Sequence, residues 1–206
     1  MKIGISGPSR AGKTAVVTKL KSNSWIKKQS FSAPAPPADQ HIKAASDLQT
    51  NEAVPLQTFI FNDHLKNIIF TTPNVIAETT ILDSLVKLLK LTREGACPVS
   101  TFDIYTKNVI DNIDKYDQIF IIPNDSEDDM QDYTDIMNII GTSTDKIITL
   151  DLLNTKKYHD IIVMSIQEKY KQGISTNEEN SNKWLTEYGQ DYFSTLSRET
   201  TGARGV

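Results

Sequence analysis

One short segment constrains this chain more than any other. Gly7-Pro8-Ser9-Arg10-Ala11-Gly12-Lys13-Thr14 matches the pattern G-x-x-x-x-G-K-[ST] at every defined position. It follows the apolar run Lys2 to Ser6 and precedes the helical pattern Lys13 to Ser22. A glycine-rich turn between a strand and a helix directs successive backbone amides and the positive end of the helix dipole toward one point. The sequence therefore predicts a loop that cradles a polyphosphate.

The residue types within this loop predict its ligand. Gly7 and Gly12 are expected to adopt backbone angles that other residues avoid. The Lys13 ammonium should reach the β- and γ-phosphates, and the Thr14 hydroxyl should complete the coordination of a magnesium ion. We therefore expect ATP or another nucleoside triphosphate, with Mg²⁺, to bind all eight residues of the loop: Gly7, Pro8, Ser9, Arg10, Ala11, Gly12, Lys13 and Thr14.

The rest of the chain alternates between short apolar runs and helical patterns. This alternation predicts a three-layer α/β fold, with a parallel five-stranded sheet and helices on both faces. Helices are expected at Pro55 to Phe70 and at Thr101 to Tyr116, and the apolar residues between Ile81 and Leu89 predict a helix that is largely covered. The predicted strands are Lys2 to Ser6, Gln29 to Ala33, Asn74 to Glu78, Gln118 to Ile122 and Lys146 to Leu150.

Length and local composition predict the domain organisation. A chain of 206 residues that is 38% hydrophobic fits one globular domain, which we place at residues 1–172. The acidic segment from Asn124 predicts a lid at residues 124–145. Gly173 to Ser181 is polar and predicts a hinge before a final helix, Asn182 to Leu196, so residues 173–206 are expected to form a C-terminal helix and a flexible tail.

Composition also excludes several classes of function. The formal net charge of −4 gives no basic footprint for nucleic acid, although a local basic groove stays open. Cys97 is the only cysteine, which fits a reducing cytoplasm, and it is expected to be a buried apolar side chain. No apolar stretch is long enough for a membrane span. The sequence predicts a soluble cytoplasmic protein and leaves its oligomeric state undetermined.

Two classes of nucleotide-binding protein do not fit. Switch GTPases need D-x-x-G, and most read guanine through N-K-x-D. No glycine of this chain has aspartate three residues before it, and Asn182-Lys183 continues as Trp-Leu. Large ATPase motors carry an apolar strand that ends in Asp-Glu, which this chain lacks. The layout that remains is that of a small kinase.

From Met1 to about Lys169 the chain resembles the small P-loop kinases of the nucleoside and nucleotide kinase type, including the nicotinamide-riboside-kinase-like AAA family. Besides the loop, Val75-Ile76-Ala77-Glu78-Thr79-Thr80-Ile81-Leu82-Asp83-Ser84-Leu85 is similar to the family's strand that ends in Asp-Arg before a Leu-Asp on the next helix. Lys115-Tyr116-Asp117-Gln118-Ile119-Phe120-Ile121-Ile122-Pro123 is similar to the strand that enters the lid. The resemblance implies phosphoryl transfer from ATP, with magnesium, to a small base-bearing acceptor.

The chain departs from the family at two places. Glu78-Thr79 stands where the family usually has Asp-Arg, so Glu78 is expected to hold a magnesium-bound water while the arginine is lost. No lysine or arginine occurs from Asn124 through Asp145, although lids of this family normally contribute arginines to the transferred phosphoryl group. An arginine for that role must come from Arg10, Arg93, Arg198 or Arg204, and Arg10 is nearest to the phosphates.

The acceptor is less constrained. A hydroxyl acceptor benefits from a carboxylate base, and in nucleoside-type kinases this residue follows the second strand. Asp39 occupies that position, with a helix N-cap as its alternative role. Asp63 and His64, on the helix from Pro55, have positions that could face the same cleft, but lone polar residues on an amphipathic helix are more often exposed, and exposure is expected here. Two other functions stay open: a kinase of a hydroxymethylated base in DNA, and a nucleotide-binding regulatory protein with little turnover.

Overall fold

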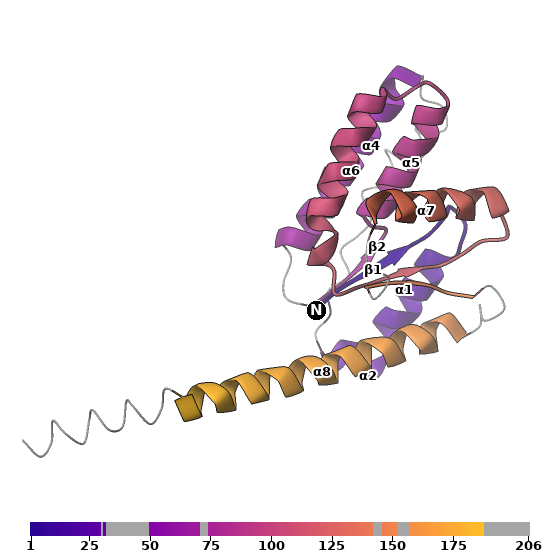
Figure 1. The fold of residues 1–206 in the computed structure, drawn as a ribbon. Coiled ribbons are helices and arrows are strands. Elements are labelled where there is room, and N and C mark those ends of the chain that lie inside the picture. Colours follow the sequence, from indigo (N-terminus) through magenta and orange to yellow (C-terminus); the bar gives the residue numbers. More distant parts are fainter. Residues whose placement is uncertain (30, 32–49, 71–73, 142–145, 152–156, 188–206) are drawn as a thin grey trace, which may run out of the picture. The chain divides into compact units, whose positions relative to one another are not determined.

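A computed structural model of the chain describes residues 1–29, 31, 50–70, 74–141, 146–151 and 157–187 (Figure 1). The strands are β1 (Lys2–Ser6), β2 (Val75–Glu78), β3 (Gln118–Ile121) and β4 (Ile147–Thr149). The helices are α1 (Lys13–Ser22), α2 (Ser24–Lys28), α4 (Thr50–Phe70), α5 (Ile81–Arg93), α6 (Val99–Asn112), the 3₁₀ turn η1 (Ile113–Lys115), α7 (Glu127–Ile140) and α8 (Tyr158–Glu187).

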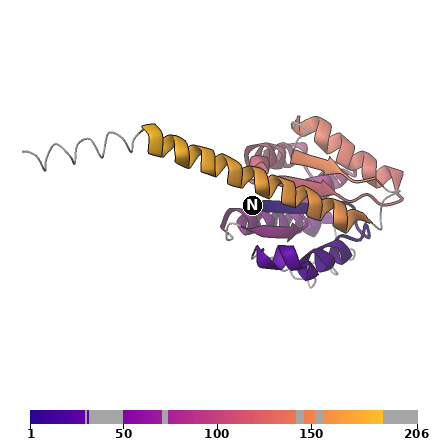
Figure 2. The ribbon, with the colours of Figure 1, turned by 90° about the horizontal axis from the view of Figure 1, so that it is seen from below.

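The sheet is parallel throughout and has the order β2-β1-β3-β4, which the colours of Figure 2 trace. Four strands therefore form it within the described residues, and the prediction of five strands was wrong for this part of the chain. Gln29, where the second strand was expected to begin, instead closes α2 by donating its backbone N–H to the carbonyls of Trp25 and Ile26. The rest of that expected strand lies outside the described residues, except Phe31, which has no regular secondary structure.

Strand β1 lies in the middle of the sheet, and both of its neighbours run in the same direction. Because all four strands are parallel, their carboxyl ends meet at one edge, where Ser6, Glu78 and Ile121 end β1, β2 and β3. In open parallel sheets this edge is where ligands bind. The loop after β1 and the turn after β2 are therefore brought together by the topology.

Helices cover both faces of the sheet. On one face, side chains of β2, β3 and β4 form a buried cluster with α4, α5, α6 and α7, while α1 packs against β1 and β2 on the opposite side (Figure 1). The predicted burial of the helix between Ile81 and Leu89 is confirmed, because only Lys87 of that stretch is exposed. Cys97 is also buried, as predicted from the sequence.

The C-terminal part differs from its prediction. The chain divides into two compact units, Met1–Ile162 and Val163–Val206, and α8 begins in the first and continues into the second. Helix α8 runs without a break through Gly173 to Ser181, so the hinge predicted there was wrong: helical backbone hydrogen bonds form despite the polar side chains. Residues 188–196 of the predicted final helix lie outside the described residues. Within the described residues, no helix combines the length and apolar character that a membrane crossing requires.

Candidate nucleotide-binding site

The loop between β1 and α1 has the backbone that its glycines were expected to provide. Gly7 has a φ of 139°, and a Cβ placed there would lie 2.2 Å from the carbonyl oxygen of Ile122. Gly12 has a φ of 86° and forms the N-cap of α1 without a side-chain cap. Any side chain at Gly7 would collide with the end of β3, so the tight passage of the loop requires glycine at that position.

Lys13 folds back over its own loop. Its ammonium donates hydrogen bonds to the carbonyl oxygens of Gly7 and Pro8, the latter at 2.9 Å, and lies 3.5 Å from the Oδ1 atom of Asp83. The Lys13 side chain is only 13% exposed. The loop therefore holds this cation at the carboxyl edge of the sheet, beside the backbone amides that begin α1, which have no partner inside the helix.

Asp83 is the centre of this site and was not among the predicted site residues. Its Oδ1 accepts hydrogen bonds from the backbone N–H of Gly7 at 3.1 Å and from the Tyr133 hydroxyl at 2.9 Å. Its Oδ2 accepts from the Ser6 hydroxyl at 2.7 Å and from both the backbone N–H and the hydroxyl of Thr80, at 2.7 and 3.0 Å. One carboxylate thus joins β1, the loop, α5 and α7.

The environment keeps this carboxylate charged. Burial by itself would raise the pKa of Asp83, but the Lys13 ammonium and the hydrogen bonds from Ser6 and Thr80 outweigh it and lower that pKa below its ordinary value of 3.8. Burial and the adjacent Asp83 charge raise the pKa of Tyr133, so its hydroxyl stays a donor. At neutral pH the site therefore contains a paired carboxylate and ammonium under the loop.

A pair of oxygen ligands lies on the other side of the loop. The Thr14 hydroxyl donates to the Oε1 atom of Glu78, which ends β2. Hydroxyl and carboxylate oxygens are the ligand types that Mg²⁺ prefers, and magnesium sites commonly combine one or two such groups with phosphate oxygens and water. Within the described residues no cluster of three or more histidine, cysteine or acidic side chains could hold a metal by itself. The pair fits a magnesium ion that arrives with a triphosphate.

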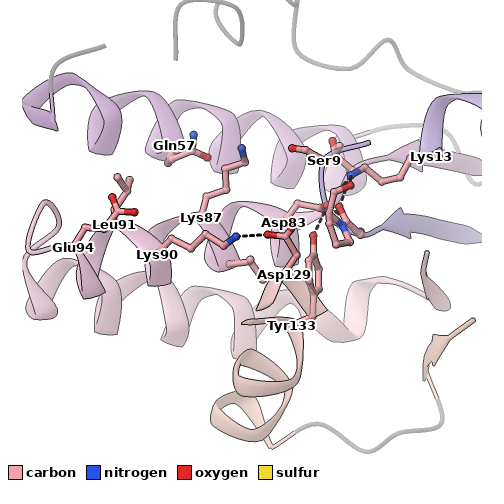
Figure 3. A pocket seen from close by; sticks show the side chains of 14 residues that line it. Ser9, Lys13, Gln57, Asp83, Lys87, Lys90, Leu91, Glu94, Asp129 and Tyr133 are labelled. Atoms are coloured by element: carbon pink, nitrogen blue, oxygen red, sulfur yellow. Dashed lines mark hydrogen bonds and ion pairs between the residues drawn. The ribbon is translucent and has the colours of Figure 1, made fainter. Parts of the chain in front are cut away.

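A cavity of about 360 Å³ opens beside the loop (Figure 3). Its walls come from the loop, from α4 and α5, and from the start of α7. It is lined by Gly7, Pro8, Ser9, Lys13, Gln57, Thr79, Asp83, Val86, Lys87, Lys90, Leu91, Glu94, Asp129 and Tyr133. Four of the eight predicted loop residues, including Lys13, therefore line a cavity of the size of a small molecule.

The wall toward α7 is fixed by ion pairs. Lys90 donates to Asp129 at 2.5 Å and lies 3.1 Å from Asp132, and the Arg93 guanidinium donates to Asp132 and Asp135. Burial of Lys90 acts to lower its pKa, but its hydrogen bonds to the two aspartates raise it overall. Three acidic residues of the segment that suggested a lid thus pair with α5, and Arg93 does not line the cavity.

Helix α4 carries a histidine near the site whose exposure was predicted incorrectly. His64 is 5% exposed because it lies on the α4 face that also carries Phe61 and Ile68. Its Nε2 lies 2.7 Å from the Thr79 hydroxyl, and its Nδ1 lies 3.3 Å from the Ser84 hydroxyl. Since the Thr79 hydroxyl donates to the Glu78 carbonyl, a neutral ring with its proton on Nε2 satisfies both contacts. Burial lowers the pKa of His64, which favours this neutral form.

The other residues that were predicted to act in the site do not line the cavity or lie outside the described residues. Arg10 is exposed, with a φ of 65°, and does not line the cavity. Asp39, Arg198 and Arg204 lie outside the described residues, so their proposed roles stay predictions. Thr79, at the position where the sequence resemblance implied an arginine, has a φ of 69°, a strained conformation for a β-branched residue.

Two sequence signals could have revealed the missed residues. Thr80 and Asp83 form a capping box at the start of α5, with the spacing [ST]-x-x-[DE] before an apolar run. Phe61, His64 and Ile68 have the three- and four-residue spacing of one buried helix face. Neither signal states that the Asp83 carboxylate also contacts the loop, because that contact joins residues about 70 positions apart.

Comparison with known proteins shows likeness at the level of the fold. No protein-family model matches the sequence, and no curated protein matches it significantly. Two structures of deoxyadenosine kinase from M. mycoides are similar. One has the products dCMP and a flexible dCDP bound (TM-score 0.57, 12% identity, 82% of this chain and 100% of that chain), and the other has bound dATP (TM-score 0.53, 14% identity, 81% and 100%).

NadR protein in complex with NR is also similar, with a TM-score of 0.52 and 15% identity over 72% of this chain and 43% of that chain. At these identities the comparison concerns architecture and not activity. This chain therefore has the α/β fold of P-loop kinases, with a parallel sheet flanked by helices.

Proposed function

We propose that this protein is a phosphotransferase that uses ATP, or another nucleoside triphosphate, with Mg²⁺, and that its acceptor is a nucleoside, a nucleotide or a related base-bearing molecule. The observation that carries the proposal is the 360 Å³ cavity, which Lys13 and three other loop residues line together with side chains of α4, α5 and α7. A cavity of this size beside Lys13 offers room for an acceptor. The fold shared with deoxyadenosine kinase supports the same class of reaction.

The residues of the loop have distinct roles in this reaction. An acceptor oxygen attacks the γ-phosphorus, the bond from that phosphorus to the β–γ bridging oxygen breaks, and its electron pair leaves with the nucleoside diphosphate. Lys13 turns from the loop carbonyls to the β- and γ-phosphates, while the amides at the start of α1 hold the phosphate oxygens. Thr14 and Glu78 would hold Mg²⁺, which neutralises phosphate charge when bound.

The roles of Asp39 as the acceptor base and of Arg10 as the charge-stabilising arginine are proposed from the sequence alone. Asp39 would accept the proton of a hydroxyl acceptor, and Arg10, on the exposed turn of the loop, would reach the transferred phosphoryl group. A regulatory nucleotide-binding protein is the competing function, favoured by the absence of lysine and arginine from α7. It differs from a kinase because it would bind nucleotide without acceptor-dependent release of ADP.

The test is a panel assay of ADP release from ATP and Mg²⁺, with nucleosides and nucleoside monophosphates as acceptors. The wild-type protein should release ADP only when a suitable acceptor is present. Lys13→Ala should weaken ATP binding by at least about tenfold in calorimetry, because a charge-assisted hydrogen bond to phosphate contributes about 1.5–3 kcal/mol.

Lys21→Ala is the matched control, since Lys21 is exposed in the last turn of the same helix. Equal ATP affinity in the two variants would remove Lys13 from the site. ATP binding without ADP release for any acceptor would favour the regulatory function instead.

A further inference from the structure

Helix α5 carries three cations near the cavity, and they differ in their partners. Lys90 and Arg93 are paired with acidic side chains of α7. Lys87 also lines the cavity, yet the described residues give it no hydrogen bond and no ion pair. In Figure 3 the Lys87 side chain extends toward Gln57 of α4, whereas Lys90 turns to Asp129. Lys87 is therefore the cation of this group that the protein itself leaves available to a ligand.

The surroundings of Lys87 favour an anion. Its side chain reaches solvent through the cavity, but the protein around it is dense enough to lower its pKa. Desolvation is the main cause of this shift, and the positive charge of Lys13 is the next. Two cations from different elements thus face one cavity and repel each other. An anion placed between them would remove both the repulsion and part of the desolvation cost.

The carboxylates that line the cavity are either paired or distant from Lys13. Asp83 accepts hydrogen bonds from Ser6, Gly7, Thr80 and Tyr133, and Asp129 is paired with Lys90. Glu94 lies at the far end of α5, about 16 Å along the helix from Asp83 at 1.5 Å per residue. Among the cavity residues that the structure describes, none offers an unpaired carboxylate near Lys13 as a base. An acceptor phosphate needs no such base, because its oxygens are already ionised.

We propose that Lys87 binds the phosphate of a nucleoside monophosphate acceptor and sets it beside Lys13, an inference that rests on the proposed function. In this reaction a non-bridging oxygen of the acceptor phosphate forms the bond to the γ-phosphorus of the triphosphate. The bond from that phosphorus to the bridging oxygen breaks, and the products are two nucleoside diphosphates. No proton needs to be removed, since a phosphate monoester is mostly dianionic at neutral pH.

The experiment compares nucleosides with their 5′-monophosphates as acceptors for the wild-type protein, Lys87→Gln and Lys87→Arg. Lys107→Gln is the matched control, because Lys107 is an exposed lysine on α6 that does not line the cavity. We expect the wild type to phosphorylate monophosphates in preference to nucleosides. Lys87→Gln should raise the KM for the monophosphate at least about tenfold, with a smaller change in kcat, while ATP affinity stays within about twofold.

Lys87→Arg should restore most of the monophosphate KM, because it keeps the charge. Turnover of nucleosides in preference to monophosphates would overturn the inference and leave the kinase intact. So would a fall in kcat at unchanged KM, which would assign Lys87 to the transferred phosphoryl group. If no acceptor is turned over, the kinase proposal fails. Calorimetry with AMP, CMP, GMP and UMP then still tests whether Lys87 binds a monophosphate, and equal affinity in Lys87→Gln would refute it.

Discussion

The two ends of α5 hold charged residues in opposite ways. At its first turn, Asp83 is 9% exposed and joins the loop, β1 and α7 through a full set of hydrogen bonds. At its last turns, Lys90 and Arg93 are 41% and 49% exposed in their side chains and pair with the acidic face of α7. The same helix therefore has a buried polar centre at the loop end and, at the other end, partly exposed cations whose shared partner Asp132 is buried.

The charged side chains at the two ends of α5 should therefore differ in how easily they rearrange. A buried carboxylate whose partners are all donors cannot lose one without leaving a charge or a donor unsatisfied, so its geometry is fixed. Exposed ion pairs contribute little because water and salt compete for both partners. The loop end should thus keep its shape, while the exposed ion pairs of Lys90 with Asp129 and of Arg93 with Asp135 can rearrange at small cost.

The largest expected effect comes from breaking the buried centre. Asp83→Asn should lower the free energy of unfolding by about 3 kcal/mol or more, because every group around the carboxylate is a donor and the new amide NH₂ must face one of them. Urea unfolding measures this change. Asp103→Asn, at an exposed position of α6, is the control and should change stability little. Equal unfolding free energies of the two variants would show that loss of the Asp83 charge does not destabilise the fold.

The same variant should alter the response to acid. Since the pKa of Asp83 is lowered in the folded protein, its contribution to stability is complete above its unfolded value near 3.8 and is lost as the pH falls through the folded value. The fall in stability below about pH 4 should therefore be steeper in the wild type than in Asp83→Asn. Parallel acid limbs in the two proteins would contradict the assigned direction.

A smaller effect should come from His64, a neutral polar group at the same end of α5. Its pKa is lowered in the folded state, so the unfolded chain binds more protons as the pH falls below about 6.5, and stability should fall there by at most about 1.4 kcal/mol per pH unit. His64→Gln should flatten this slope. His159→Gln, at the partly exposed start of α8, should keep it. Identical slopes in both variants would mean that another group titrates.

The smallest effect should come from the exposed end. Asp129→Asn removes one partner of Lys90 and should cost less than about 1 kcal/mol, because both side chains are partly solvated. The loss should shrink further in high salt, as measured by urea unfolding at 0.05 and 1 M NaCl, whereas the cost of Asp83→Asn should change little. A salt-independent loss of several kcal/mol at Asp129 would make the two ends of α5 equivalent.

Local pattern was sufficient for the elements that depend on neighbouring residues. The loop from Gly7 to Thr14, the strand β1 and the covered apolar face of α5 could be predicted because glycine spacing and helical period are short-range properties. The same reasoning failed at Gln29 and at Gly173 to Ser181. There the choice between strand, hinge and helix depended on hydrogen bonds that polar composition does not specify.

The sequence by itself determined that a glycine-rich loop with the G-x-x-x-x-G-K-[ST] pattern follows a buried strand and precedes a helix. Tertiary structure decided which side chains surround it, because parallel strands bring segments distant in sequence to one edge of the sheet. Asp83 reaches Gly7 and Lys13 in this way, and Glu78 reaches Thr14. The partners of Lys90 were likewise decided only when α7 packed against α5. The residue type determines the charge of a side chain, but the fold determines whether another side chain already pairs with that charge.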